Sequence, residues 1–338
     1  MKGKMFIVLA VILMILVVLS ACMNSDTGSA EPSESSKTGS SSGPMVYVNN
    51  RDANNVQVID SKKNEIVSTI TVGEKPTYNE IGPKGRYVYV VNSKSEDVSI
   101  IDVKSNEVIK TIPVGKTPKG INFTPDGKWV FVINEGEHTV TVIDTESMEK
   151  TTTIEVGQFP HNGVASPDSK KFYVTNTGSN SVSVIDTASQ KVIRTIKGVE
   201  GSPHNLNITP DGQTLLVTLT KNSAVGVIDL NAGEIVKTIP VGIGHHVLDI
   251  TPDGEYAYVA NISENFISVI DISEQKVVKK IEVGTGPHGI TVSENGEMIY
   301  TAVTGENKVA VIDRASNVVV DTIDTGQFPF FISTIESS

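Results

Sequence analysis

The sequence has a single cysteine, Cys22, among its 338 residues. A lone thiol can neither form an intramolecular disulfide nor supply several thiolates to one metal, so both are excluded. Aromatic residues are also scarce, at 5% of the chain with one tryptophan. Stability must therefore come from buried aliphatic side chains and from hydrogen-bonded pairing between strands.

Positive charge is sparse as well. The chain has 28 lysines and arginines against 39 aspartates and glutamates, for a net charge of −11, and the basic residues form no cluster. An acidic surface repels phosphate backbones, so we expect no nucleic-acid partner.

The N-terminus has the layout of a secretory signal. Lys2 and Lys4 precede an apolar run from Met5 to Leu19, which is short for a bilayer-spanning helix. The following Leu19-Ser20-Ala21-Cys22 resembles the bacterial lipobox. That resemblance implies that 1–21 is a lipoprotein signal peptide and that Cys22 carries lipid. The alternative is an uncleaved membrane anchor.

Residues 22–44 then form a predicted disordered tether, with eight serines in the 22 positions after Cys22. The lipid would bind the membrane. We therefore expect an extracytoplasmic, monomeric protein that is anchored to the bacterial cell membrane by lipid.

The rest of the chain is built from internal repeats. An aspartate that ends an apolar strand pattern recurs every 42 or 43 residues, at Asp60, Asp102, Asp144, Asp186, Asp229, Asp271 and Asp313. Each period holds short stretches that alternate apolar and polar residues between polar turns, as strands do. A period near 42 is the length of one four-stranded propeller blade.

The two ends of the repeat region complement each other. The chain enters at 45–50, in what should be a second strand, and leaves at 329–335, which aligns with the innermost strand of the other repeats. We therefore predict an all-β fold over 45–335: a seven-bladed β-propeller of four-stranded blades, closed by the C-terminal strand joining the N-terminal blade.

The repeats resemble the YVTN-type β-propeller family. The residues that carry the resemblance are YVVN (89–92), YVTN (173–176) and YVAN (258–261), with VSVID, TIPVG and TPDGK nearby. The resemblance covers 45–335 and implies the fold. It implies no single function, because such propellers serve many roles.

One register of the repeats is rich in histidine. At the second position of the inner strand the residues are Thr77, Lys119, His161, His204, His246, His288 and Phe330, and His245 replaces the usual preceding proline. Because inner strands line the channel of a propeller, we predict that these histidines converge near one mouth.

Neutral imidazole binds transition metals, so His161, His204, His246 and His288, with His245, are candidate ligands for a metal or a haem iron. The resemblance adds that related propellers include the copper-cluster domain of nitrous oxide reductase and the haem-binding domain of cytochrome-type nitrite reductases. The alternative is that each histidine only bonds to nearby backbone. The cofactor, if any, stays unknown.

A second polar set lies three residues further along the inner strands, at Glu80, Asn122, Asn207, Asp249, Thr291 and Ser333. It either lines the channel more deeply or faces a neighbouring blade. The sequence does not decide between these positions.

Three functions remain open. The first is a non-catalytic binding or interaction module, and the second is a metal- or haem-binding protein that uses the histidines. The third is a hydrolase or oxidoreductase. A site for an acidic substrate would use arginine to hold it. The chain has four arginines, and none of them lies in the inner-strand register. We assign no catalytic residue.

Overall fold

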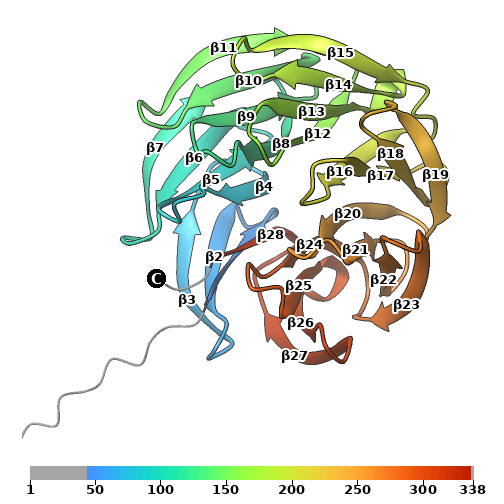
Figure 1. The fold of residues 1–338 in the computed structure, drawn as a ribbon. Coiled ribbons are helices and arrows are strands. Elements are labelled where there is room, and N and C mark those ends of the chain that lie inside the picture. The colour runs from blue at the N-terminus through green and yellow to red at the C-terminus, as the bar shows by residue number, and fades with distance from the viewer. Residues whose placement is uncertain (1–43, 336–338) are drawn as a thin grey trace, which may run out of the picture. The chain divides into compact units, whose positions relative to one another are not determined.

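The computed structural model describes residues 44–335, apart from the side chains of His245 and His246, and these residues belong to one compact unit. They form seven four-stranded antiparallel sheets arranged as a ring, as Figure 1 shows. The fold prediction is confirmed. The predictions for 1–21, for Cys22 and for the linker up to residue 43 lie outside the described residues.

Each blade runs from an inner strand to an outer one. The inner strands, which surround the channel, are β4 (Pro76–Ile81), β8 (Pro118–Phe123), β12 (Pro160–Ala165), β16 (Pro203–Ile208), β20 (His245–Ile250), β24 (Pro287–Val292) and β28 (Pro329–Ile335). The second strands are β1 (Met45–Asn50), β5 (Tyr87–Asn92), β9 (Trp129–Asn134), β13 (Lys171–Asn176), β17 (Thr214–Leu219), β21 (Tyr256–Asn261) and β25 (Met298–Val303).

The two outer rings of strands complete the blades. The third strands are β2 (Asn55–Asp60), β6 (Asp97–Asp102), β10 (Thr139–Asp144), β14 (Ser181–Asp186), β18 (Ala224–Asp229), β22 (Phe266–Asp271) and β26 (Lys308–Asp313). The fourth strands are β3 (Glu65–Thr71), β7 (Glu107–Pro113), β11 (Glu149–Glu155), β15 (Lys191–Lys197), β19 (Glu234–Pro240), β23 (Lys276–Glu282) and β27 (Val318–Asp324). Two 3₁₀ turns, η1 (Thr177–Ser179) and η2 (Thr304–Glu306), follow β13 and β25.

The ring closes through strand pairing between the two ends of the unit. Strand β28 is antiparallel to β1, in a register that places Ile335 opposite Met45 and Ser333 opposite Tyr47. One sheet therefore contains β28, β1, β2 and β3. This pairing covers the edge of β1 that would otherwise present unpaired backbone groups.

The apolar core lies between the blades. Seven clusters of buried residues each join two adjacent sheets, as Tyr47 of β1 and Val88 of β5 illustrate. The alternation along the second and third strands places aliphatic and aromatic side chains on both faces of each blade, where they meet the neighbouring blades. Burial at these interfaces fixes the blades radially about the channel.

The recurring aspartates have a structural role in the turns that follow the third strands. The Asp102 carboxylate accepts hydrogen bonds from the backbone N–H groups of Lys104 and Ser105, both at 3.0 Å, and the equivalent residues act alike. Such bonds satisfy the donors of the turn between the third and fourth strands. Within residues 44–335, no helix is long and apolar enough to cross a membrane.

Candidate functional site

The inner strands surround a channel that contains two separate cavities. One cavity, of about 240 Å³, is lined by His161, His204, His288, Lys119 and Glu135 among others. We call it the histidine chamber. The other, of about 290 Å³, includes Glu80, Asp249, Asn162 and Ser333 in its lining. We call it the acid chamber.

A pair of aromatic rings separates the two chambers. Tyr78 lines both cavities, and its ring centroid lies 4.1 Å from that of Phe331. The Tyr78 hydroxyl accepts a hydrogen bond of 3.4 Å from the Asn205 side-chain amide, which comes from β16 across the channel. Tyr78 is only 2% exposed, and Phe331 is partly buried.

Small residues make room for the barrier. Tyr78 and Phe331 occupy the third position of their inner strands, where β8 has Gly120 and β24 has Gly289. A Cβ atom at Gly289 would lie 2.7 Å from the Phe331 Cα, too close for any side chain. Glycine therefore lets β24 approach the strand that carries one of the two rings.

The structure brings three of the five predicted histidines into one chamber. The rings of His161 and His204 stack with their centroids 3.4 Å apart. His288 is almost completely buried and its Nδ1–H donates to the Phe330 carbonyl oxygen at 2.8 Å, which is the backbone role that the sequence left as an alternative. His245 and His246 lie on β20, but their side chains are outside the described part of the chain.

The convergence of His161, His204 and His288 agrees with the sequence, whereas metal binding stays a prediction. Among the side chains that the structure describes, no group of three or more His, Cys, Asp or Glu is arranged to hold a metal ion. The side chain of His246 lies outside the described part of the chain, so the predicted four-histidine set stays untested.

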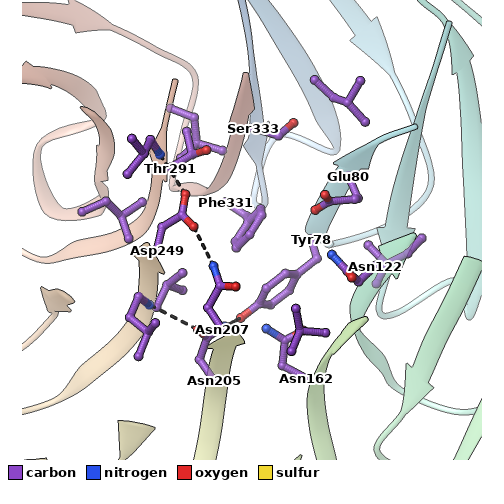
Figure 2. Close-up of a pocket in the computed structure, with 18 of the residues that line it drawn as sticks. Tyr78, Glu80, Asn122, Asn162, Asn205, Asn207, Asp249, Thr291, Phe331 and Ser333 are labelled. Atoms are coloured by element: carbon purple, nitrogen blue, oxygen red, sulfur yellow. Dashed lines mark hydrogen bonds between the residues drawn. The ribbon is translucent and has the colours of Figure 1, made fainter. Parts of the chain in front are cut away.

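The second polar set lines the acid chamber. All six residues, Glu80, Asn122, Asn207, Asp249, Thr291 and Ser333, contribute to its wall. The structure thus selects the deeper channel position over contact with a neighbouring blade. Figure 2 shows the Glu80 and Asp249 carboxyls on opposite sides of the cavity, with Phe331 and Tyr78 between them.

Asp249 is held by a network of donors. One carboxylate oxygen accepts from the Asn207 side-chain amide at 2.7 Å and from the Ile250 backbone at 2.9 Å, and the other accepts from the Val292 backbone at 2.8 Å. Burial raises the pKa of Asp249 to about 6, and these bonds, with one from Thr291, limit the rise. The residue is therefore a fixed carboxylate that is mostly ionised at neutral pH.

Glu80 has a different environment from Asp249. Burial raises the pKa of its carboxyl to about 8, and the negative charge of Asp249 adds to the rise. Both residues are only partly buried, and both line the cavity. At neutral pH the empty chamber thus pairs an ionised Asp249 with a mostly protonated Glu80.

Two buried polar atoms in this chamber have no partner. The Asn162 Oδ1 and the Ser333 Oγ make no hydrogen bond within the described residues, although the two residues are only 7% and 8% exposed. Leaving a buried polar group unsatisfied costs about 1–3 kcal/mol. Such groups in a cavity wall are explained when a bound molecule or water completes them.

Sequence reasoning missed the third position of the inner strands. Tyr78, Asn162, Asn205 and Phe331 all occupy it, yet they mix aromatic and amide side chains and form no uniform set around the ring. The available signal was that two other blades have glycine at this position. Large and small side chains at equivalent positions around the channel indicate that some of the large ones cross its axis.

Two family models match the chain. The model of the choice-of-anchor I domain matches residues 34–255, which is more than half of the chain. The chain belongs to the choice-of-anchor I domain family. A second model, described as a YNCE-like β-propeller, matches residues 201–338 of this choice-of-anchor I protein. The YNCE-like model agrees with the predicted propeller, and the narrower YVTN-type assignment stays a prediction.

Solved structures share the fold of this choice-of-anchor I propeller. Hydrazine synthase from Kuenenia stuttgartiensis aligns with a TM-score of 0.70 and 22% identity, over 78% of this chain and 96% of that one. A functionally unknown protein from Desulfotomaculum acetoxidans aligns with a TM-score of 0.78 and 14% identity, over 87% and 99%.

A third structure is the dihydro-heme d1 dehydrogenase NirN in complex with DHE. It aligns with a TM-score of 0.65 and 18% identity over 83% of this chain, which spans 63% of the NirN chain. At these identities the likenesses establish the fold alone. None of the curated proteins matches the choice-of-anchor I chain.

The protonation of Glu80 makes stability depend on pH. Between the ordinary glutamate pKa of 4.5 and the folded value of about 8, the folded state keeps a proton that the unfolded state has lost. The free energy of unfolding should therefore fall from pH 5 to pH 8. In Glu80→Gln this fall should be smaller by at least about 1 kcal/mol, since one pKa unit corresponds to 1.36 kcal/mol.

Urea unfolding at pH 5 and pH 8 measures the difference. Glu135→Gln is the matched control, because Glu135 lines the histidine chamber on the other side of the barrier. Equal pH dependence in the wild-type protein and Glu80→Gln would show that Glu80 is not protonated in the folded protein.

Proposed function

We propose that the protein is a lipid-anchored, extracytoplasmic, non-catalytic binding module that holds a small polar ligand in the acid chamber. The observation that carries this proposal is the pair of buried, unpartnered polar atoms, Asn162 Oδ1 and Ser333 Oγ, in a cavity wall that is otherwise well hydrogen-bonded. A ligand with hydrogen-bond donors would satisfy both.

The geometry of the chamber favours binding over catalysis. Both oxygens of Asp249 accept bonds from the scaffold, which holds the carboxylate still. The Ser333 hydroxyl has no hydrogen-bonded base among the described residues, whereas a serine nucleophile needs one. These residues can therefore recognise a ligand through fixed polar groups.

The acid chamber reaches the surface at the ends of the inner strands. Glu294 and Pro83 line the cavity and are also exposed, so a small molecule can enter between the loops that follow β24 and β4. A ligand that enters there meets the aromatic barrier before it reaches the histidine chamber. Tyr78 and Phe331 would thus form the bottom of the binding site.

The anchoring part of the proposal is supported by the sequence. A signal-like segment ends in Leu19-Ser20-Ala21-Cys22, and the only cysteine stands at the position that lipid attachment requires. Two or three acyl chains, at roughly 0.8 kcal/mol per buried methylene, would hold the protein firmly on a membrane. The acidic propeller would then be displayed outside the cytoplasm.

Cell fractionation tests the anchor. In a bacterial host that processes lipoproteins, the wild-type protein should enter the membrane fraction and incorporate labelled fatty acid, whereas Cys22→Ala should lose the label. Ser25→Ala, in the same linker, serves as the control and should behave like the wild type. Fatty-acid labelling that persists in Cys22→Ala would contradict lipid attachment at this residue.

Thermal unfolding of the full chain in mild detergent tests ligand binding. The compounds are a panel of aliphatic amines, neutral sugars, zwitterionic amino acids and carboxylates, each at millimolar concentration. At least one class should raise the unfolding temperature of the wild type, because a ligand that binds only the folded state stabilises it.

Two leucine variants locate the binding. Ser333→Leu places a larger apolar side chain in the chamber wall and should abolish the shift, while Ser105→Leu on an exposed turn should preserve it. The proposal fails if no class shifts the wild type, or if the shift is the same in Ser333→Leu.

The second candidate function is metal or haem binding in the histidine chamber. It is favoured by the convergence of His161, His204 and His288 on one cavity and by the close stacking of the first two rings. NirN, which has the same fold, was solved in complex with DHE. That likeness makes haem-type molecules sensible probes for this chamber.

Metal titration tests the second candidate. The full chain, produced without an affinity histidine tag, is titrated with Cu²⁺, Zn²⁺ and Ni²⁺ and with haem, followed by calorimetry and absorption. If the chamber is the site, replacing His161, His204, His246 and His288 with alanine removes stoichiometric binding. His138→Ala is the control, because His138 lies outside the chamber. Binding that survives the fourfold replacement would eliminate this function.

A further inference from the structure

The acid chamber has one sign of charge. Glu80 and Asp249 face its interior and Glu294 lines its opening, whereas no lysine, arginine or histidine belongs to its described lining. The chain as a whole carries a net charge of −11. In a cleft that is lined by negative charge and has walls of low dielectric constant, the negative electrostatic potential is concentrated inside. The chamber therefore attracts cations and disfavours anions.

The two inner carboxyls lie on opposite walls. Their strands, β4 and β20, are separated around the ring by β28 and β24 on one side and by β8, β12 and β16 on the other. Figure 2 shows the Glu80 and Asp249 side chains approaching the cavity from these opposite sides. One compact ion cannot be centred on both groups, whereas an elongated molecule with a positive charge at each end can contact both.

The remaining polar groups suit ammonium ends. The Asn162 Oδ1 and the Ser333 Oγ are buried acceptors without a donor. An ammonium group has three N–H donors and no acceptor, so it can bond to a carboxylate and still supply these atoms. The unpartnered atoms are evidence for a ligand that does not depend on the charges.

The bottom of the chamber suits a short alkyl chain. The rings of Tyr78 and Phe331, which are tilted by 34° to each other, present an aromatic surface between the two carboxyls. Such a surface packs against methylene groups and also attracts cations by about 0.5–2 kcal/mol. The cavity volume of about 290 Å³ corresponds to roughly ten water-sized groups at ~30 Å³ each. That space limits the ligand to about ten non-hydrogen atoms.

A metal ion fits these observations less well. Calcium takes six to eight converging oxygen ligands and magnesium six. Glu80 lies on the wall opposite Asp249, so the two carboxyls do not converge on a single ion. The described residues also contain no group of three acidic or histidine side chains that could hold a metal.

We propose that the acid chamber binds a short aliphatic diamine, with one ammonium group on Glu80, the other on Asp249, and the methylene chain over Tyr78 and Phe331. This inference rests on the proposed binding function and specifies its ligand class. A monoamine of the same length could contact only one of the two carboxyls and should bind more weakly.

Binding should release a proton. Glu80 is mostly protonated in the empty chamber at neutral pH, and an ammonium group beside it favours the carboxylate. An alkyl ammonium with a pKa near 10.4 stays charged throughout this range. Affinity should therefore rise from pH 6 to pH 8.

Other groups around Glu80 do not supply this pH dependence. The titratable neighbours in the chamber are Tyr78, Asp249 and Glu294. On the strands packed against β4, the charged side chain is Lys119 of β8, which is paired with Glu135 at 3.4 Å in the histidine chamber, and β1 and β5 add tyrosines. Asp249 titrates near pH 6, so the change between pH 7 and pH 8 belongs to Glu80.

The test is isothermal calorimetry on the full chain in detergent at pH 8, with 1,5-diaminopentane, 1-aminopentane, CaCl₂ and MgCl₂ as separate titrants. The diamine should bind in a 1:1 ratio and at least tenfold more tightly than the monoamine. Glu80→Gln and Asp249→Asn should each weaken it at least tenfold. Glu135→Gln, which removes a channel carboxylate beyond the barrier, should change the affinity less than twofold.

Buffers of different ionisation enthalpy give a second readout. At pH 7 the wild type should release close to one proton per bound diamine, and Glu80→Gln should release less than half of that. Glu80→Gln and Asp249→Asn are nearly isosteric with the wild type. As long as folded Glu80→Gln binds the diamine measurably, its proton count can be compared with that of the wild type, whatever the size of the affinity loss.

The alternative outcomes are distinguishable. If the diamine does not bind, or binds both variants as tightly as the wild type, the inference is wrong. If a sugar, amino acid or carboxylate binds with the same dependence on Ser333→Leu, the inference is overturned while the proposed binding function stands. If Ca²⁺ or Mg²⁺ alone binds and both carboxyl variants lose it, the chamber is a metal site. If no compound binds, both proposals fail.

Discussion

The antiparallel pairing of β28 with β1 is the constraint on which the rest of the structure depends. It joins the two ends of the described unit and so completes the seventh sheet. The barrier in the channel depends on it directly, because Phe331 belongs to the closing strand and Tyr78 to the first complete blade. Without closure the two rings would not meet, and the chambers would merge.

The barrier gives each side of the channel a separate chemistry. Histidines at the second inner-strand position face one chamber, and the carboxyl and amide groups at the fifth position face the other. Only a few residues separate the two sets along each strand. The buried ring of Tyr78 and the partly buried ring of Phe331 therefore keep the histidines of one chamber apart from the carboxyls of the other.

The acid chamber is costly for the fold, which supports a role in binding. Glu80 is held at a pKa of about 8 by burial, and Asn162 and Ser333 have buried atoms without partners. Each of these features destabilises the empty protein, and a well-packed apolar filling would not. Proteins retain such local costs mainly where a ligand offsets them.

The sequence predicts the ring well because its signals are local and repeated. The 42-residue period and the alternating strands define the blades. The chain enters late, at 45–50, so the first blade lacks one strand, and the strand left over at the C-terminus closes the ring. The site is only partly predictable. The histidine and polar registers are visible in the alignment, as His161 and Glu80 show. The separation of the chambers is not, because Tyr78 crosses the axis to reach Asn205, a contact between residues 127 apart.

Hydrogen exchange at the junction of the two ends tests ring closure most directly. Mass spectrometry would follow amide exchange of the full chain in peptides that cover 45–50 and 329–335, with 87–92, the equivalent second strand of the next blade, as reference. If β28 closes the ring, 45–50 should be protected to the same degree as 87–92, because its backbone is bonded on both sides. Exchange of 45–50 and 329–335 within seconds, while 87–92 stays protected, would contradict closure and with it the division of the channel.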